Sequence, residues 1–193
     1  DYLYKDPSHV MAFIENHDTD RFLGETQDTL ALKQALALLL TVNRIPQLYY
    51  GTEVLMNGTK QVTDGNVRKD FPGGFPGDTR SCFTTEGRTK AENDMFRWTA
   101  RLLHWRQGNE VITKGKQTQF IPQNGVYVVA RSYNGKNVMT VINGTSKAAT
   151  MKAERYAEII GDAQEATNIL TGHKINISKD VKLAPRGVMV LEF

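Results

Sequence analysis

The chain has 193 residues, of which 40% are hydrophobic and 23% are charged, and its formal net charge is +3. Such a composition is typical of a globular protein with a proper core, and the scattered Lys and Arg residues argue against a nucleic-acid-binding surface. The longest apolar run, ALALLLTV, is far shorter than the roughly 20 residues of a membrane-spanning helix, and a single cysteine, Cys82, excludes a disulfide within the chain.

The first ten residues, DYLYKDPSHV, contain neither an initiator methionine nor a signal peptide. We therefore expect either a processed protein or a segment of a longer one.

Strand and helix signals alternate in the first part of the chain. The apolar run VMAFIE predicts a buried parallel strand over residues 10–15. The segment TQDTLALKQALALLLTV has leucines at helical spacing and predicts a helix that begins at Asp28 or Thr29. IPQLYYG predicts a second short strand, with Pro46 at its start, where the missing backbone donor is tolerated. This order favours a parallel α/β architecture.

Residues 56–88 are polar and rich in Gly, Asp and Pro, and they are too long for a simple connection, so we expect them to be functional. Thr89-Lys-Ala-Glu92 is a capping-box pattern and predicts the start of a helix that ends at Gly108. The residues on one face of this helix are Met95, Trp98, Leu102 and Trp105.

The sequence after residue 110 predicts almost only strands. The strand-like segments are TQFIP, GVYVVARSYNGKNVMTVING, AEIIG, ATNIL, HKINIS and VKLAPRGVMVLEF. Asn134-Gly135, between two alternating runs, predicts a tight hairpin. Eight short strands separated by turn residues favour an antiparallel sandwich.

The segment FIENHDTDRF places five ionisable side chains directly after the first predicted strand. Active sites of parallel α/β folds lie at the carboxyl ends of the strands, which is where Asn16, His17 and Asp18 fall. An isolated NHD is also explained by a helix that begins at Asp18 or Thr19, with a structural His17. For the three residues alone, this second interpretation is favoured.

Other chemistries find little support. The sequence has no HxH, HExxH or CxxC spacing for zinc, no GxSxG nucleophile and no GxGxxG phosphate loop. Calcium bound through Asp, Asn and backbone oxygens stays open, although no EF-hand pattern is present. What remains is the carboxylate chemistry of glycoside hydrolysis, which also needs groups that bind sugar hydroxyls. Aromatic residues that could stack on sugars, or pack in the core, are Tyr49, Tyr50, Phe71 and Phe75.

Three segments in order, FIENHDTDRF, IPQLYYGTEVLM and DGNVRKDFPGGFPGD, followed by LAPRGVMVLEF at the end, resemble the C-terminal third of α-amylase superfamily glycoside hydrolases. The resemblance is greatest to the neopullulanase and cyclomaltodextrinase branch, and it covers nearly the whole chain. It implies that residues 1–108 are the last βα units, strands seven and eight, of a TIM (β/α)8 barrel. Residues 109–193 would form a small antiparallel β-sandwich domain.

The resemblance also implies roles for single residues. Asp18 matches the family's third invariant carboxylate, which binds two sugar hydroxyls and favours ring distortion but is neither nucleophile nor proton donor. Glu53 is expected to be structural. Substrate binding is expected from Asn16, His17, Arg21, Arg68 and Asp70. No metal ligand is assigned, no cofactor is required, and Ca²⁺ stays open for the full-length enzyme.

The family's nucleophile and acid lie on earlier strands, for which the residues before Phe13 leave no room. The resemblance thus implies a retaining enzyme that acts on α-1,4/α-1,6-glucans or maltooligosaccharides, of which this chain alone is inactive. Its strand edges would need the missing upstream barrel half or self-association for burial. A periplasmic or secreted location is favoured over a cytoplasmic one.

Two alternatives stay open. A transglycosylase of the same superfamily would differ only in the acceptor of the second step. A non-catalytic carbohydrate-binding module would use sandwich tyrosines, although core packing explains these residues more simply; the candidates are Tyr127, Tyr133 and Tyr156.

Overall fold

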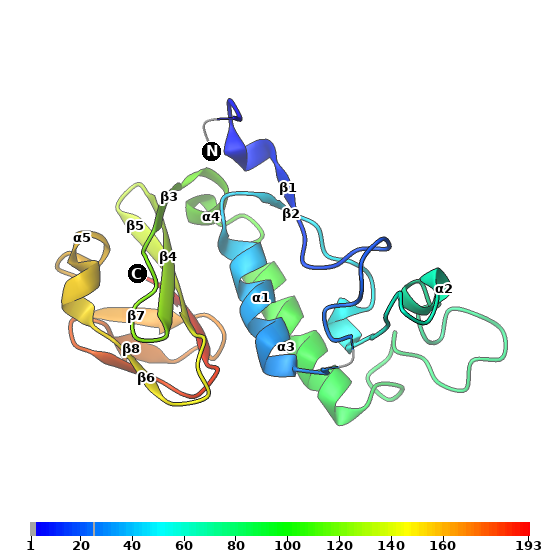
Figure 1. Ribbon diagram of the computed structural model, residues 1–193. Coiled ribbons are helices and arrows are strands. Elements are labelled where there is room, and N and C mark those ends of the chain that lie inside the picture. Colours follow the sequence, from blue (N-terminus) through cyan, green and yellow to red (C-terminus); the bar gives the residue numbers. More distant parts are fainter. Residues whose placement is uncertain (1–2, 25) are drawn as a thin grey trace.

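A computed structural model describes residues 3–24 and 26–193 of the chain. Figure 1 shows a β-sandwich on the left, the two long helices α1 (Thr29–Thr41) and α3 (Lys90–Arg106) in the middle, and irregular loops on the right. The loops therefore lie on the side of the helices that faces away from the sandwich. Among the residues that the structure describes, no helix is both long and apolar enough to cross a bilayer.

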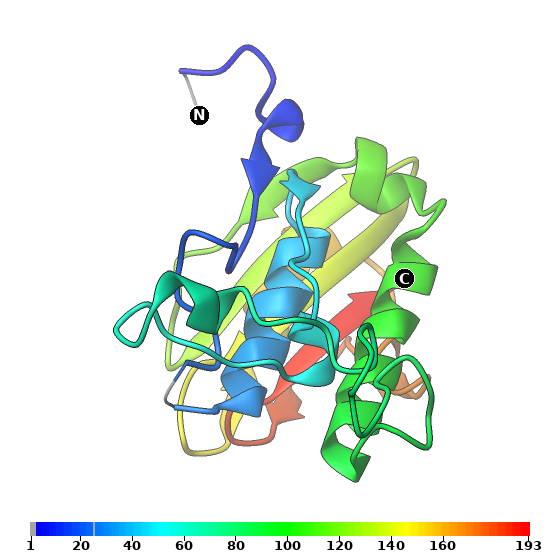
Figure 2. The same ribbon diagram turned by 90° about the vertical axis from the view of Figure 1, so that its right-hand side faces the viewer.

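The first unit is a parallel pair of short strands joined by α1. Strand β1 (Met11–Ala12) pairs in parallel with β2 (Ile45–Pro46), and the two lie side by side above the upper end of α1 in Figure 2. The Asp28 side chain accepts a hydrogen bond from the backbone N–H of Ala31, so Asp28 caps α1 as predicted. The predicted parallel strands and connecting helix are confirmed.

The same strands differ from the prediction in length and burial. Each has only two residues, and the side chains of Met11 and Ile45 are about half exposed, at 54% and 51%. The prediction of a buried strand over residues 10–15 is wrong for this structure because, within the described residues, β1 and β2 pair only with each other. Ala12 and Ile14 pack against the core cluster of α1 and α3, whereas Met11 and Phe13 are exposed.

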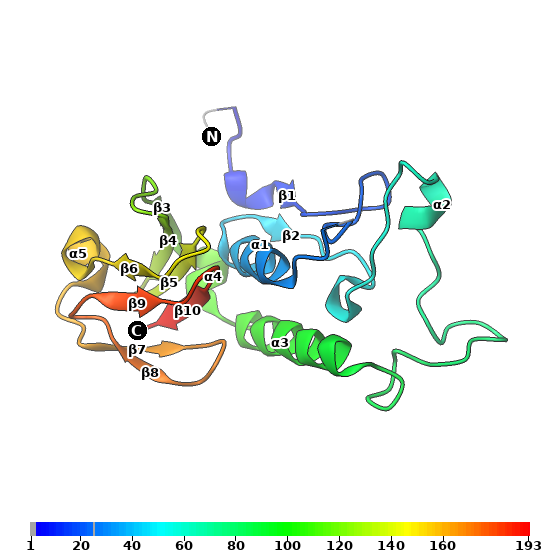
Figure 3. The ribbon, with the colours of Figure 1, turned by 60° about the horizontal axis from the view of Figure 1, so that its bottom comes forward.

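Helix α3 begins with the predicted capping box, in which Thr89 and Glu92 each accept a hydrogen bond from the other's backbone N–H. It lies beside α1, and Figure 3 shows the two helices as one layer between the sandwich and the loops. A core cluster fills the space between α1, α3 and the segment after β1. Its buried members are Leu23, Leu32, Leu36, Leu39 and Met95.

Helix α4 (Glu110–Lys114) lies where the sequence predicted almost only strands. The Asn109 side chain accepts a hydrogen bond from the backbone N–H of Ile112, which caps the helix start. Val111 and Ile112 pack into the cluster between helices and sheet. Two adjacent apolar residues suit a strand or one helical turn equally, so only this packing separates the two structures.

The rest of the chain is the predicted antiparallel sandwich. The main sheet has the order β3-β4-β5-β10-β7-β8, and β6 pairs separately with β9. The bounds are β3 (Lys116–Gln119), β4 (Val126–Tyr133), β5 (Lys136–Asn143), β6 (Ala149–Met151), β7 (Glu165–Asn168), β8 (Lys174–Asn176), β9 (Val181–Leu183) and β10 (Val188–Glu192). Asn134 and Gly135 both have positive φ, at 48° and 75°, so the predicted β4–β5 hairpin turn is confirmed.

Two parts of the sandwich were predicted incorrectly. The segment AEIIG is not a strand but helix α5 (Ala157–Ile160), which buries Ile160. Strand β6 was not predicted, because its three residues are too few to show alternation. Short elements of this kind take their structure from the core they cover.

The central strands are buried on both faces. Val126, Val128 and Ala130 of β4 point into the sandwich core, whereas Val138 of β5 and Val190 of β10 pack against α1, α3 and α4. This second contact joins the sandwich to the helices through a continuous apolar cluster.

Candidate functional site

The segment that follows β1 folds back on itself and turns two side chains outward. The Asn16 side-chain oxygen accepts a hydrogen bond from the Asp18 backbone N–H at 2.8 Å, and the Asn16 N–H donates to the Thr19 hydroxyl at 3.0 Å. These bonds form an Asx-type turn. It is no helix start, and it leaves the side chains of His17 and Asp18 about 60% exposed, at 60% and 63%.

The structure brings Arg68 next to Asp18, although fifty positions separate them in the sequence. Arg68 Nη2 lies 3.0 Å from Asp18 Oδ1, and Arg68 Nε–H donates to the His17 carbonyl oxygen at 3.0 Å. His17 Nε2 lies 3.2 Å from the other Asp18 oxygen, Oδ2. The Asp18 carboxylate is thus flanked by a guanidinium and an imidazole, each able to donate a hydrogen bond.

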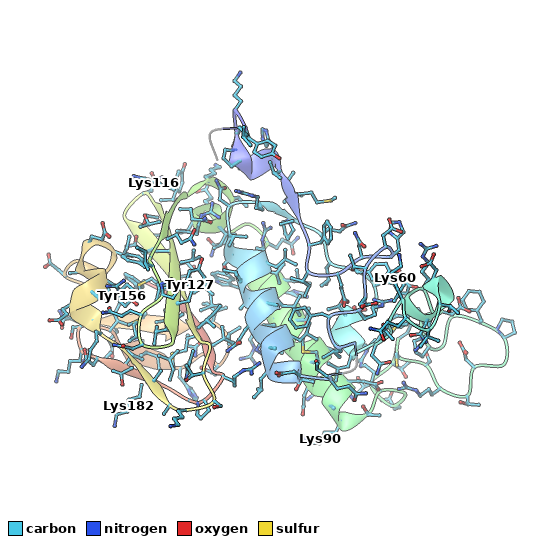
Figure 4. The ribbon with its side chains drawn as sticks, in the orientation of Figure 1. Lys60, Lys90, Lys116, Tyr127, Tyr156 and Lys182 are labelled. Atoms are coloured by element: carbon cyan, nitrogen blue, oxygen red, sulfur yellow. The ribbon has the colours of Figure 1, made fainter. Side chains whose placement is uncertain are left out.

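Lys60 and Asp64 extend this cluster, and neither was among the residues predicted for the site. Lys60 Nζ donates to the Asp18 carbonyl oxygen at 3.3 Å and lies 3.3 Å from Asp64 Oδ1. Asp64 begins the short helix α2 (Asp64–Val67), and its Oδ2 lies 4.0 Å from Arg68 Nη2. Figure 4 shows Lys60 beside α2, on the loop side of the molecule. No sequence spacing links Lys60 to Asp18, because the fold alone brings them together.

Asp70 lies apart from this cluster. It lines a hollow of about 300 Å³ together with Lys69, Arg80 and Glu92. Arg80 forms a two-pronged ion pair with Glu92, at 2.7 and 2.9 Å. Among the described residues, Asp70 makes no ion pair with His17 or Arg68, so the expected substrate-binding set divides into two places.

Arg21 differs from the expectation that it contacts sugar. Its side chain is only 1% exposed, and its Nη1 lies 3.6 Å from the buried Glu15 carboxylate. The guanidinium also lies over the rings of Tyr49 and Tyr50, at 4.0 and 4.8 Å from their centroids. The buried carboxylate and the aromatic faces draw the side chain inward, away from the open surface.

A second hollow, of about 360 Å³, lies between the segment after β2 and helix α3. It is lined by Leu48, Tyr49, Tyr50, Glu53, Phe96, Thr99, Ala100, Leu103 and His104. Burial raises the pKa of the Glu53 carboxyl above its usual value. Glu53 is the one described carboxyl group whose pKa is raised, and it lies in this hollow rather than beside Asp18.

Metal binding receives no support from the described residues, which contain no group of three or more His, Cys, Asp or Glu side chains able to hold an ion. Cys82 is buried, and this burial raises the pKa of its thiol. A reactive thiolate needs the opposite shift.

The cluster around Asp18 can therefore bind and orient hydroxyl groups. A carboxylate, an imidazole and a guanidinium offer both donors and acceptors on one exposed surface. Retaining glycoside hydrolysis also requires two carboxyl groups about 5–5.5 Å apart, one of them with a raised pKa. The described carboxyl group whose pKa is raised by burial, Glu53, lies in the hollow beside α3.

Comparison with known proteins gives matches to one group of enzymes. Residues 117–192 match the family model of the cyclo-malto-dextrinase C-terminal domain. The cyclomaltodextrin glucanotransferase of Paenibacillus macerans is 27% identical over 173 residues, which are 86% of this chain and 22% of that protein. The alpha-amylase of Niallia circulans is 27% identical over 177 residues, which are 88% of this chain and 30% of that protein. The chain thus spans less than a third of either relative's length.

The fold has the same relatives. The crystal structure of an Anoxybacillus alpha-amylase matches 99% of this chain and 39% of its own chain, with a TM-score of 0.73 at 21% identity. The likeness at this level of identity concerns the fold. Residues 117–192 match the cyclo-malto-dextrinase C-terminal domain, and over most of its length the chain is similar in sequence to a cyclomaltodextrin glucanotransferase and an alpha-amylase.

Proposed function

We propose that this chain contributes the sugar-hydroxyl-binding part of the active site of a retaining enzyme that acts on α-glucans. The observation that carries the proposal is the exposed Asp18 carboxylate, held between Arg68 at 3.0 Å and His17 at 3.2 Å. Such an arrangement can accept hydrogen bonds from two neighbouring hydroxyls of one sugar ring. It holds the ring, and it neither attacks the anomeric carbon nor protonates the leaving oxygen.

In this proposal β1 and β2 are the seventh and eighth strands of a (β/α)8 barrel, with α1 between them and α3 after the second. The parallel pairing and the position of Asn16, His17 and Asp18 after the first strand support it. The barrel part would cover residues 1–108 and the sandwich residues 109–193. The exposed apolar side chains of Met11 and Ile45 indicate a surface that other strands cover, supplied by an upstream barrel half or by a second copy.

The specific activity that we propose is that of the neopullulanase and cyclomaltodextrinase branch, with maltooligosaccharides or α-1,4/α-1,6-glucans as substrates. Transfer to a sugar acceptor in place of water is a second candidate, because the relatives include a cyclomaltodextrin glucanotransferase. Analysis of the products formed with and without added glucose acceptor separates the two. Longer transfer products identify the transglycosylase.

A carbohydrate-binding module without catalysis is less favoured. Tyr156, one of the three candidate stacking tyrosines, is only 2% exposed and packs edge-on against Phe120 at 4.9 Å between ring centroids. Figure 4 marks both Tyr127 and Tyr156 within the sandwich. Burial also raises the pKa of the Tyr127 hydroxyl. These rings stabilise the sandwich more than they offer a sugar platform.

The proposal is tested with the full-length gene product and Asp18→Asn. Because Asp18 would bind hydroxyls most strongly in the transition state, we expect kcat on maltooligosaccharides to fall by roughly a hundredfold or more. Asp162→Asn, an exposed substitution in the sandwich, serves as the matched control and should leave kcat unchanged.

We further expect the 193-residue chain alone to show no hydrolysis of maltooligosaccharides, pullulan or cyclodextrins above blank. Turnover by this chain that survives repurification and disappears in Asp18→Asn would overturn that expectation. Equal kcat in the Asp18→Asn and wild-type full-length proteins would overturn the role of Asp18.

A further inference from the structure

A buried arginine lies directly beneath the surface that carries Asp18. Arg21 and Glu15 are each about 2% exposed, and they follow β1 in the same polar segment as Asp18. The Glu15 carboxylate accepts hydrogen bonds from the Phe22 backbone N–H and from the Thr52 hydroxyl. Glu15 thereby joins the segment after β1 to the segment after β2.

The Arg21 guanidinium reaches two further places in the chain. Its Nε–H donates to the Val67 carbonyl oxygen at 3.0 Å, and its Nη1–H donates to the Tyr50 carbonyl oxygen at 2.6 Å. The Arg21 backbone N–H also donates to the Gly58 carbonyl oxygen, at 3.0 Å. One side chain and its own backbone therefore fix three loops relative to one another.

The contact to Val67 is the one that bears on the site. Val67 is fully buried and directly precedes Arg68, whose guanidinium touches both His17 and Asp18. Arg21 lies three residues after Asp18. Asp18 and Arg68 are consequently linked twice: by their own ion pair at the surface, and through the chain from Asp18 to Arg21, the buried hydrogen bond from Arg21 to Val67 and the peptide bond from Val67 to Arg68.

The contacts that Arg21 makes require a guanidinium. Its planar fork donates to two carbonyl oxygens at once while its central carbon lies 4.0 and 4.8 Å from the ring centroids of Tyr49 and Tyr50, and an ammonium group on a flexible stem cannot do this. Burying the charge is costly unless it is paired, and the Glu15 carboxylate at 3.6 Å supplies the partner. Even so, Arg21 Nη2 is buried without a hydrogen-bond partner in the described structure. A buried donor left unpaired for the sake of stability alone would be unusual.

We infer that Arg21 is a positioning residue of the sugar-binding site, which holds Asp18 and Arg68 at a fixed separation from beneath. The inference deepens the proposed function and rests on it for the kind of ligand, a sugar. That Arg21 fixes the separation of Asp18 and Arg68 does not depend on the proposed function. Arg21 itself touches no substrate. Its function is to present the Asp18 carboxylate and the Arg68 guanidinium together before a ligand arrives.

The test compares Arg21→Lys with Arg131→Lys in the 193-residue chain. Arg131 is the matched control because it is equally buried, at 1% exposed, and donates to the carbonyl oxygens of Thr41 and Gly115, away from the Asp18 site. The readout is the side-chain Nε–H signal of Arg68 in a ¹⁵N NMR spectrum, assigned by its loss in Arg68→Lys. This hydrogen is bound to the His17 carbonyl oxygen in the structure, so it should exchange slowly with water.

We expect the Arg68 signal to persist in wild type and in Arg131→Lys and to be lost to exchange in Arg21→Lys, at temperatures where all three are folded by circular dichroism. Persistence in Arg21→Lys, or equal loss in both variants, would overturn the inference. If Arg21→Lys does not fold, Thr52→Val replaces it: this variant keeps the side-chain shape and removes one donor from Glu15. A weakened but present Arg68 signal then supports the inference, and an unchanged signal contradicts it.

A second arm measures kcat and KM of the full-length protein on maltooligosaccharides. Arg21→Lys should lower kcat/KM at least tenfold, while Arg131→Lys keeps the wild-type value below its melting temperature. Full activity in Arg21→Lys would contradict a positioning role. If the wild-type full-length protein is inactive on every α-glucan, the proposed function fails, whereas the NMR result still decides whether Arg21 positions Arg68.

Discussion

At the scale of single residues, three buried or half-buried charged side chains of this protein have different surroundings. Arg21 is paired with Glu15, Arg131 is surrounded by carbonyl oxygens, and Glu53 lies in a largely apolar hollow. The surroundings of Glu53 oppose its charge, and burial is the main cause of its raised pKa. The ionisation of Glu53 should therefore be visible in the pH dependence of stability.

The first prediction concerns Glu53→Gln. A carboxyl whose pKa is higher in the folded than in the unfolded chain binds more protons when folded, so the free energy of unfolding falls as pH rises from its ordinary value of 4.5 upward. Glutamine removes this loss. We expect the variant to gain stability relative to wild type between pH 4 and pH 7, as measured by urea denaturation at each pH.

For Glu92→Gln we expect the opposite change in the pH dependence of stability. The hydrogen bonds from Arg80 hold the pKa of Glu92 below its usual value, so its contribution is present above pH 4.5 and is lost as pH falls through the folded pKa. This variant should be less stable than wild type at pH 7, with a difference that shrinks on acidification. The same slope in both variants would contradict the assignment.

At the scale of elements, helix ends show how closely local sequence sets local structure. Thr89 and Glu92 satisfy two unpaired backbone N–H groups at the start of α3, whereas Asp28 and Asn109 each satisfy one, at the starts of α1 and α4. These caps act within three residues, so the sequence was enough to predict those of the long helices α1 and α3, whereas the Asn109 cap of the short α4 was missed.

A second stability prediction follows for the start of α3. Thr89→Ala removes the hydroxyl that accepts from the Glu92 backbone N–H, and we expect the free energy of unfolding to fall by about 1 kcal/mol. Lys90→Ala, one residue further on, is the control. Its side chain is 91% exposed and pairs only with Asp94, and such surface pairs contribute little. Urea denaturation of both variants at pH 7 gives the comparison, and equal effects would argue against the capping role.

At the scale of the whole molecule, the sandwich and the helices are joined by a polar contact inside an apolar interface. Arg131 of β4 donates to the carbonyl oxygens of Thr41 at the end of α1 and of Gly115, at 3.1 and 2.8 Å. Burial lowers the pKa of its guanidinium to about 10, and nearby Arg106 adds to the shift. The Thr140 hydroxyl donates to the Thr41 hydroxyl in the same place, at 2.7 Å.

Removing the Arg131 contact should weaken the packing of the sandwich against the helices. We expect Arg131→Gln to lower the free energy of unfolding by about 3 kcal/mol, because the carbonyl oxygens of Thr41 and Gly115 would stay buried without donors. Arg97→Gln, on the exposed face of α3, makes the same chemical change and should cost less than about 0.5 kcal/mol. Comparable losses would show that Arg131 does not join the two parts.

The elements that could be predicted from the sequence are those with long periodic patterns or specific turn chemistry. Helices α1 and α3 and the Asn134-Gly135 hairpin belong to this group. The short elements α4, α5 and β6 were missed or given the wrong type, because three to five residues carry no period that distinguishes a helix from a strand. Their structure depends on which core they cover.

The candidate site divides in the same way. Asp18, His17 and Asn16 form a local motif, and the sequence by itself determined that they lie together after a strand, as it determined the sandwich and the family resemblance. Only the tertiary structure decided that Arg68 and Lys60 meet Asp18, that Asp70 lies in a separate hollow, and that Arg21 is buried beneath the site. The physical reason is that contacts across forty or fifty positions depend on how the loops pack on α1 and α3. Whether an arginine faces solvent or a buried carboxylate is settled by that packing, and no spacing in the sequence records it.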